Sequence, residues 1–174
     1  DYGVEGLWPH LYTDLFCAAD DFMIKELLPR RVPRDHIAVT GIPVRVGFDE
    51  EHDTAAIRER FSLPQDKMIA LVMAGAKYSE PYFPFRRIVE SMFGELSNFL
   101  DMHFVFLAGE DYTYAEHLKQ VFKERGITNV SVFNYVEDMV DLMSASDLIV
   151  AKSGGLAVTE CICARLPLIL VGKS

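Results

Sequence analysis

The sequence contains little cysteine, and its cysteines are not spaced for a disulfide or a metal site. There are three among 174 residues, at Cys17, Cys161 and Cys163. The count is odd, no C-x-x-C spacing occurs, and Cys161 and Cys163 are too close for an ordinary bridge. This pattern predicts buried free thiols in a reducing cytosol rather than a disulfide-stabilised or zinc-binding domain.

Long hydrophobic runs and an excess of positive charge are also missing. The longest apolar stretches, such as 69–76, are far too short to cross a bilayer, and the sequence shows no signal-peptide pattern. Asp and Glu number 26 against 17 Lys and Arg, which gives a formal net charge of −9. A nucleic-acid-binding domain would show a basic face, so we expect no nucleic-acid partner. Phosphate binding stays open, because backbone amides need no net positive charge.

The motifs of several common nucleotide and hydrolase sites do not occur. There is no G-x-G-x-x-G of a dinucleotide fold, no G-x-x-x-x-G-K-[ST] of a P-loop and no G-x-S-x-G of a hydrolase. There is also no D-x-D pair that could clamp a metal ion onto a nucleoside diphosphate. The histidines are scattered without ligand spacing, at His10, His36, His52, His103 and His117. We therefore expect no metal site, and helix N-terminal amides would have to hold any phosphate.

Apolar segments alternate with helical patterns through the second part of the chain. Short strands are predicted at 69–73, 103–107, 130–132, 148–150 and 168–171. Helices are predicted between them at 84–100, 113–125 and 136–144, and from about residue 156. Five strands alternating with four helices predict an α/β fold with a doubly wound, mostly parallel, Rossmann-like sheet. Turns at Gly75 and Gly109 are expected at the carboxyl edge of this sheet, where ligands bind in such folds.

The longest predicted helix, 84–100, rests on apolar residues that recur near every 3.6 positions. They would form one buried face: Ile88, Val89, Met92, Phe93, Leu96 and Leu100. The next helix, 113–125, is expected to stop at Gly126, because glycine favours the position just after a helix end.

The first part of the chain predicts a smaller arrangement of its own. Two short strands are expected near 15–17 and at 37–39. Asp20 can cap a helix between them, which Pro29 would end. The segment 41–44 breaks the second strand, and the irregular, acidic segment 44–53 is expected to be a solvated linker. Because the chain begins with Asp rather than Met, we expect an excerpt of a longer protein.

The turn formed by Ser153, Gly154 and Gly155 carries the strongest chemical signal. It follows an apolar strand and leads into a helix, with Glu160 in the second turn. The first N–H groups of a helix lack internal partners and the helix dipole favours negative charge there, while glycine lets a phosphate approach the backbone. Glu160 can accept hydrogen bonds from the hydroxyls of an attached ribose. One interpretation is therefore a nucleotide or nucleotide-sugar site, and the other is a plain strand-to-helix turn with Ser153 as N-cap.

Motifs along most of the chain resemble those of a known family. The main series is Asn134-Tyr135-Val136, Met139, Leu142-Met143, Ser146-Asp147-Leu148, Ala151-Lys152-Ser153-Gly154-Gly155-Leu156 and Thr159-Glu160. Two more pieces precede it in order, Asp1-Tyr2 ahead of Trp8, and Val39-Thr40-Gly41-Ile42-Pro43-Val44 with Phe48. Together they resemble the C-terminal part of the monogalactosyldiacylglycerol synthase and diacylglycerol glucosyltransferase family. The peptidoglycan lipid-linked N-acetylglucosaminyltransferase is a more distant relative of that family.

The resemblance implies a GT-B glycosyltransferase that moves a hexose from a UDP-sugar to a lipid acceptor such as diacylglycerol. Residues 1–46 would be the tail of the N-terminal acceptor domain and the linker, and 47–174 an incomplete nucleotide-sugar-binding domain. The catalytic base and the lipid groove would lie outside this sequence. UDP-sugar would be the donor, with no metal or other cofactor required. The full-length protein would be cytoplasmic and peripheral to the inner face of the membrane.

The same resemblance assigns the donor-binding residues. The diphosphate would meet the loop residues Ser153, Gly154, Gly155 and, from the opposite loop, Gly75. The ribose would meet Glu160, and the uracil would lie against Tyr135 and Val136. For the last two, ordinary packing at a helix start is the open alternative.

The chain departs from the family pattern in several places. Glu5 stands where relatives usually carry His, the loop 73–76 is usually richer in glycine, and the Pro-Gly-Gln-Glu segment that touches the sugar would follow Ser174. Two alternatives stay open. A UDP-N-acetylglucosamine 2-epimerase-like enzyme shares the Ser-Gly-Gly turn but usually has Gln and paired Glu after it. A non-catalytic α/β interaction domain would need no ligand.

Overall fold

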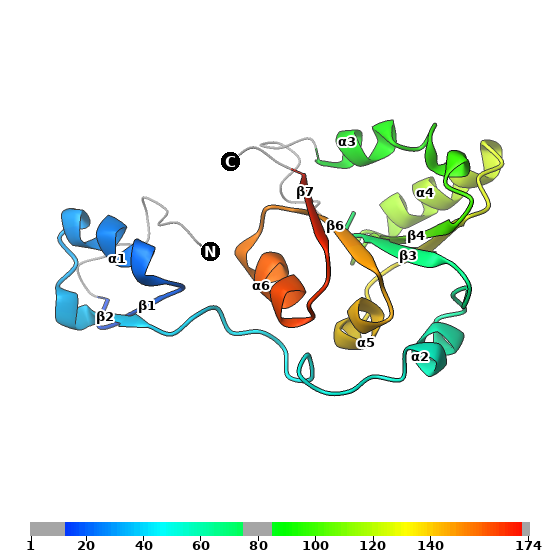
Figure 1. Ribbon diagram of the computed structural model, residues 1–174. Coiled ribbons are helices and arrows are strands. Elements are labelled where there is room, and N and C mark those ends of the chain that lie inside the picture. Colours follow the sequence, from blue (N-terminus) through cyan, green and yellow to red (C-terminus); the bar gives the residue numbers. More distant parts are fainter. Residues whose placement is uncertain (1–12, 75–84, 172–174) are drawn as a thin grey trace.

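The computed structural model of the chain describes residues 13–74 and 85–171. Strands in this part of the chain form two parallel sheets (Figure 1). The smaller sheet pairs β1 (Phe16–Ala18) with β2 (Ile37–Val39). The larger sheet has the order β5-β4-β3-β6-β7, built from β3 (Met68–Val72), β4 (Met102–Leu107), β5 (Val130–Phe133), β6 (Leu148–Lys152) and β7 (Leu168–Val171). The small sheet lies apart from the large one, with an extended segment running between them (Figure 1).

The larger sheet has the doubly wound parallel topology that the sequence predicts. Its central strand, β3, pairs with β4 on one side and β6 on the other, and all neighbouring strands are parallel. The connecting helices are α3 (Phe85–Ser91), α4 (Tyr112–Glu124), α5 (Met139–Ser144) and α6 (Gly155–Cys163). Strand order reverses between β3 and β6, and ligands of such sheets bind outside the carboxyl ends of the strands at that point.

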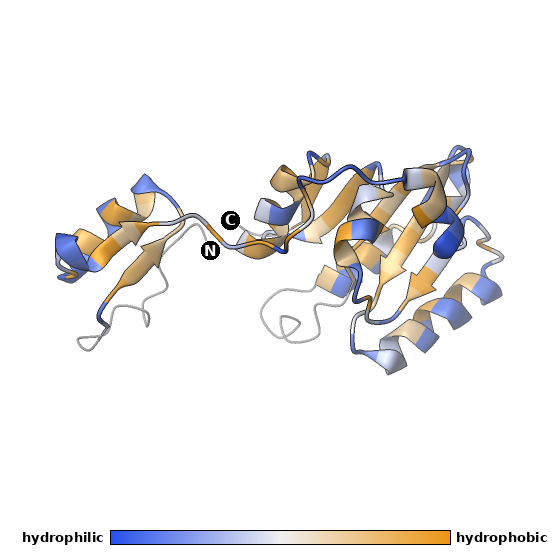
Figure 2. Cartoon of the chain, turned by 90° about the horizontal axis from the view of Figure 1, so that it is seen from below, coloured by the Kyte–Doolittle hydropathy of each residue, from blue (hydrophilic) through white to orange (hydrophobic). Residues whose placement is uncertain are grey.

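Both faces of the larger sheet are buried. Successive side chains of a strand point to opposite faces, so Ala70 and Val72 join one apolar cluster while Ile69 and Leu71 join the other. The first cluster packs under α3 and α4 and the second under α5 and α6. Figure 2 shows the apolar strands inside and the polar positions on the outer helices. Burial on both faces explains why these strands read as almost continuous apolar runs.

Aspartate caps fix where several helices begin. The side chains of Asp20, Asp53 and Asp111 each accept a hydrogen bond from the backbone N–H three residues later. These caps begin α1 (Asp21–Leu27), α2 (Thr54–Arg60) and α4. An N-cap acceptor satisfies one of the N–H groups that the helix itself leaves unpaired. Gly126 has φ of 65° after the end of α4, as expected for a glycine that stops a helix.

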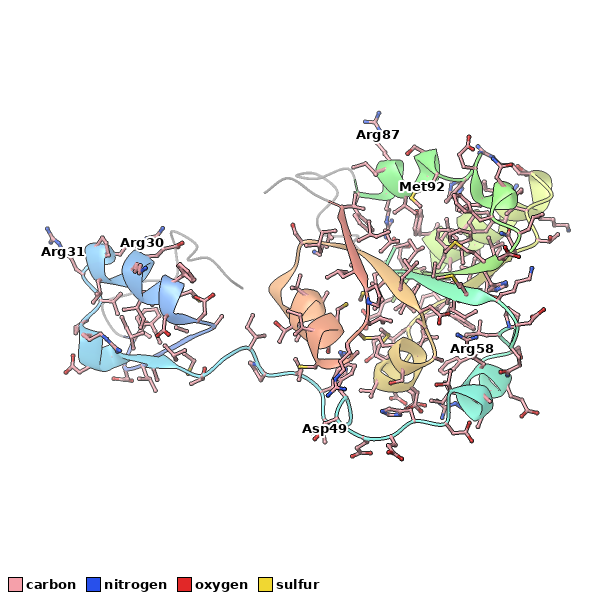
Figure 3. All side chains as sticks on the ribbon, in the orientation of Figure 1. Arg30, Arg31, Asp49, Arg58, Arg87 and Met92 are labelled. Atoms are coloured by element: carbon pink, nitrogen blue, oxygen red, sulfur yellow. The ribbon has the colours of Figure 1, made fainter. Side chains whose placement is uncertain are left out.

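Arg58 ties α2 to the end of the sheet opposite the carboxyl edge. The Arg58 guanidinium donates to the carbonyls of Ala145 and Lys67 at 3.0 and 3.1 Å, and to the Asp147 carboxylate at 2.9 Å. Figure 3 shows this side chain reaching from α2 toward the larger sheet. These three hydrogen bonds compensate the cost of burying the Arg58 guanidinium, because its donors are paired inside the protein.

The predicted helix over 84–100 is wrong beyond Ser91. α3 ends there, turns follow, and only a short 3-10 helix forms at Leu96–Asn98. Gly94 makes a continuous helix costly, and the side-chain amide of Asn129 holds the irregular backbone instead. That amide donates to the carbonyls of Leu96, Phe99 and Met102.

The apolar period of this region only partly predicted burial. Val89, Phe93 and Leu96 are buried as expected, and Met92 packs against the same cluster. Ile88 and Leu100 are exposed: Ile88 lies on the outer side of α3, and Leu100 follows the end of the helical path. Spacing therefore predicted some of the buried positions correctly, but it wrongly predicted the burial of Ile88 and Leu100 and did not predict the end of the helix at Ser91.

Several smaller expectations also change. The helix predicted from residue 136 begins at Met139, and β6 runs on to Lys152. Pro29 lies inside a 3-10 turn, Leu28–Arg30, that continues α1, because proline is tolerated where its missing N–H is not needed. The three cysteines are free, as expected, but only Cys161 is buried, while Cys17 and Cys163 are exposed.

Candidate functional site

A cavity of about 390 Å³ opens at the carboxyl edge of the larger sheet. The ends of β3, β4, β5 and β6 contribute to its wall, through residues such as Met73, Leu107, Tyr135 and Lys152. The first part of α6 closes one side, and Arg45 from the linker closes another. The cavity therefore lies where a doubly wound sheet is expected to bind a ligand.

The N-terminus of α6 lines the cavity. Gly154 is the N-cap, with φ of −99° and no side-chain cap, and Gly155 is the first helical residue. A helix N-terminus favours an anion, because first-turn N–H groups have no acceptor within the helix and the dipole is positive there. A Cβ at Gly154 would meet only Cε of Lys152, at 3.9 Å. Packing therefore does not demand glycine here, but the glycine leaves the backbone accessible to a ligand.

Ser153 does not cap α6. The N-cap is one residue later, and the helix has no side-chain cap bond. Ser153 is exposed and is not part of the cavity wall. The prediction that Ser153 is the N-cap of α6 is therefore wrong.

Glu160 lies on α6 with its carboxylate inside the protein. Its side chain is 4% exposed, and Oε1 accepts a hydrogen bond from Nη1 of Arg45. Burying an ionised carboxylate is costly unless a charged donor pairs with it. Arg45 is 46% exposed, so one partner of the ion pair is buried and the other reaches in from the surface.

The neighbouring thiol also lies in this buried environment. Burial raises the pKa of Cys161 to about 11, and the negative charge of Glu160 adds to the shift. The Cys161 thiol is therefore neutral at pH 7, when a thiolate is the reactive form. We assign this cysteine to the apolar core under the sheet, where it packs.

Tyr135 and Val136 follow β5 and face the same cavity. The Tyr135 side chain is largely exposed, at 58%, while Val136 packs partly against the core. An exposed aromatic ring at a cavity mouth offers a flat apolar surface with a polar hydroxyl. Both residues are thus placed to contact a planar ligand group.

The linker is docked onto α5 and so holds Arg45 beside the cavity. Gly47 has φ of 114°, and a Cβ there would approach Cγ1 of Val140 at 3.3 Å. Nε2 of His52 lies 2.8 Å from the Gly47 carbonyl, and its Nδ1 lies 3.3 Å from Asp141 on α5. The acidic run 49–51 is exposed, and Figure 3 shows Asp49 on the outer side of the linker.

The cavity therefore combines anion-binding and hydroxyl-binding groups. Lys152 supplies positive charge beside the α6 N-terminus, Arg45 pairs with Glu160, and Glu160 is the one acidic side chain among the described residues of the wall. Gly155 and Glu160 are separated by about 7.5 Å along the helix axis. This arrangement suits a phosphate at the helix start and a sugar hydroxyl farther along.

Five predicted site residues meet at this cavity: Tyr135, Val136, Gly154, Gly155 and Glu160. Gly75 lies outside the described residues. Sequence reasoning missed Arg45, although it directly follows the Gly-Ile-Pro-Val segment that contributed to the family resemblance. Its role depends on a contact across 115 positions of sequence, which no local pattern reveals.

The described residues offer neither a metal-binding cluster nor a membrane-spanning helix. Within 13–74 and 85–171, no group of three or more His, Cys, Asp or Glu side chains could hold a metal ion. In the same residues, no helix is both long enough and apolar enough to cross a bilayer.

Sequence comparison relates the chain to glycosyltransferases. Residues 70–173 match the family described as the glycosyltransferase family 28 C-terminal domain. The processive diacylglycerol beta-glucosyltransferase of Bacillus mycoides is 27% identical over 173 residues. That alignment covers 98% of this chain and 42% of the Bacillus protein, so the chain spans less than half the length of that relative.

Solved structures share the fold. Anabaena HepE in complex with UDP-glucose gives a TM-score of 0.59 at 12% identity, covering 90% of this chain and 44% of that protein. The UDP-GlcNAc 2-epimerase of Methanocaldococcus jannaschii, in complex with UDP-GlcNAc and UDP, gives 0.61 at 16% identity, covering 90% and 45%. At these identities the likeness shows the architecture alone.

Proposed function

The chain belongs to the glycosyltransferase family 28 C-terminal domain family, and we propose that its cavity binds a UDP-sugar as the donor for glycosyl transfer. The observation that carries the proposal is the meeting of two features at one cavity. The Gly154–Gly155 start of α6 suits a diphosphate, and the buried Glu160 carboxylate suits ribose hydroxyls. Neither feature alone would specify a nucleotide.

Different residues of the cavity wall would contact the diphosphate, the ribose and the uracil of UDP. The diphosphate would lie at the α6 N-terminus near Lys152, and the ribose hydroxyls would donate to Glu160. The uracil would lie against Tyr135 and Val136 at the end of β5. Ser153 is exposed at the turn and does not line the cavity, so it would contact the diphosphate only if the ligand extended beyond the cavity.

In the proposed reaction, the sugar–phosphate bond breaks and negative charge develops on UDP. The N-terminus of α6 and the Lys152 side chain already lie beside the place where that charge would develop. They would therefore stabilise it without rearranging. Backbone and side-chain groups would then do what a metal ion does in other transferases, and no metal would be required. A base from the rest of the full-length protein would activate the acceptor hydroxyl.

For the acceptor, we propose a lipid such as diacylglycerol, on the strength of the sequence relatives' names. Residues 1–46 would form the tail of the acceptor domain and the linker, and 47–174 the donor domain. The full-length protein would act in the cytoplasm at the inner face of the membrane. The epimerase alternative has only a shared fold in its favour, while the sequence similarity points to transferases.

Titration of the chain with UDP, UDP-glucose and ADP, by calorimetry or NMR, tests the donor site. We expect UDP and UDP-glucose to bind in the presence of EDTA, with shifts at Tyr135, Gly154 and Gly155, and ADP to bind less tightly. A folded sample that ignores millimolar UDP would refute the site. In the full-length protein, release of free UDP only when diacylglycerol is present would support transfer, and sugar epimerisation without acceptor would support the alternative.

A further inference from the structure

We propose that Arg45, a linker residue, is a positioning residue for ribose recognition: it holds the Glu160 carboxylate in place and oriented toward the nucleotide. This inference rests on the proposed UDP site. The observation is the hydrogen-bonded ion pair between Nη1 of Arg45 and Oε1 of Glu160, two groups that line the same cavity. Arg45 acts through Glu160 rather than on the reacting atoms.

Burial makes the carboxylate dependent on this partner. Glu160 is 4% exposed, so its charged form loses most of its hydration and needs a charged donor. Within the described residues, Arg45 supplies the one hydrogen bond found for this carboxylate, and it engages Oε1 alone. Oε2 therefore remains for ribose hydroxyls, which donate to a carboxylate more strongly than to a neutral acid.

The linker determines where Arg45 points. Gly47, two residues on, has a positive φ, and a Cβ there would crowd Val140 on α5, while His52 bonds the Gly47 carbonyl. These contacts anchor the segment on α5, so the guanidinium enters the cavity from a fixed direction. A side chain that is half exposed can thus be ordered well enough to orient a buried one.

This role predicts an effect on one part of the ligand. Discrimination between UDP and 2′-deoxy-UDP depends on the acceptor that meets the 2′-hydroxyl, so it should depend on Arg45. Affinity for pyrophosphate, which has no ribose, should not. A direct phosphate contact by Arg45 would produce the opposite pattern, with UDP and pyrophosphate weakened together.

The test compares UDP, 2′-deoxy-UDP and pyrophosphate by NMR titration on the same chain. Wild type is expected to prefer UDP over 2′-deoxy-UDP by about tenfold, the size of one hydrogen bond to a charged group. Arg45→Ala is expected to reduce that ratio to about twofold while pyrophosphate affinity changes less than about twofold. Arg45→Lys should restore part of the ratio, because it keeps the charge but not the guanidinium geometry.

Two controls separate positioning from general damage. Arg87→Ala removes an exposed arginine on α3 that is not part of the cavity wall, and it should leave the UDP ratio unchanged. In the Arg45→Ala/Glu160→Ala double variant, the ratio should match that of Glu160→Ala alone, because both changes remove the same recognition. Circular dichroism melts establish that each variant is folded.

The outcomes distinguish this inference from the proposed function. Absence of UDP binding by wild type refutes the UDP site itself. UDP binding with an unchanged or increased UDP-to-deoxy ratio in Arg45→Ala refutes only the positioning role. Equal losses of UDP and pyrophosphate refute it in favour of a phosphate contact. A UDP-to-deoxy ratio that collapses in Arg45→Ala but not in Arg87→Ala supports it.

Discussion

The Glu160 carboxylate lies inside the protein, and among the described residues the half-exposed side chain of Arg45 is the one that pairs with it. Buried carboxylates of this kind are uncommon without a task, because an apolar residue would pack there at lower cost. Its position on α6, five residues beyond Gly155, makes hydroxyl recognition the task that fits best.

Replacing Glu160 by alanine tests that role directly. We expect Glu160→Ala to weaken UDP by roughly tenfold or more, about 1.5–3 kcal/mol for hydrogen bonds to a charged group. Inorganic phosphate should bind as before, because it has no ribose. Calorimetry with both ligands measures the two losses, and equal losses would contradict ribose recognition.

Cys161 gives a prediction that depends on pH. Its pKa is raised from 9.0 to about 11, chiefly by burial, so the folded state holds the proton more tightly than the unfolded chain. The stability from this group is complete below pH 9 and is lost as pH rises from 9 toward 11. At pH 8 we expect iodoacetamide to label the exposed Cys17 and Cys163 first, with Cys161 protected.

Mass spectrometry of the labelled peptides measures the order of reaction. Denaturant provides the control, since all three thiols should then react at similar rates. Rapid labelling of Cys161 in the folded protein would show that the α6 side of the core is open to solvent.

At the scale of elements, the turn from β6 into α6 contains a glycine, Gly154, that packing does not require but that ligand binding would. Gly154 has an ordinary φ, and a Cβ there would make one ordinary contact. Loss of stability and loss of ligand can therefore be measured independently at this position.

We expect Gly154→Ala to cost less than about 1 kcal/mol of folding free energy. It should weaken UDP by about tenfold or more, or ~1.4 kcal/mol, because the methyl group occupies the space beside the helix amides. Gly94→Ala is a matched control, since Gly94 also has open space around it but lies away from the cavity. Unchanged UDP affinity in Gly154→Ala would move the diphosphate away from this turn.

Elements with strong local signals were predicted well. The strands of the larger sheet are apolar and short, and α4 has both an aspartate cap and a terminal glycine. The region after α3 was predicted wrongly. Its apolar residues keep helical spacing through Gly94, but the helix itself ends at Ser91. The deciding contact there comes from Asn129, about thirty residues later, which no local pattern reports.

The candidate site shows the same limit. Gly154, Gly155 and Glu160 lie on one element, so strand-to-helix spacing was enough to place them together. Arg45 reaches them across the chain, and its linker context indicated only a solvated segment. Charge pairing over long sequence separations depends on tertiary structure and could not be predicted.

For the whole molecule, ligand-linked stability distinguishes a donor-binding domain from an inert one. A ligand at 100 times its Kd stabilises the folded state by about 2.7 kcal/mol. For a chain of this size we expect UDP to raise the melting midpoint by roughly 5–10 °C, while uridine raises it less. Thermal melts followed by circular dichroism measure the shift, and a midpoint indifferent to UDP would favour an interaction domain without a nucleotide site.

The contact between the linker and α6 also affects the design of chimaeras made from this protein and a relative. A natural place to join halves of two relatives is the irregular stretch between β2 and α2, because no strand or helix is cut there. A junction after residue 46, however, exchanges Arg45 together with the preceding part of the chain and leaves Glu160 in the other parent. A junction before residue 45 keeps both members of the pair from one ancestor, so chimaeras made a few residues apart should inherit different nucleotide preferences.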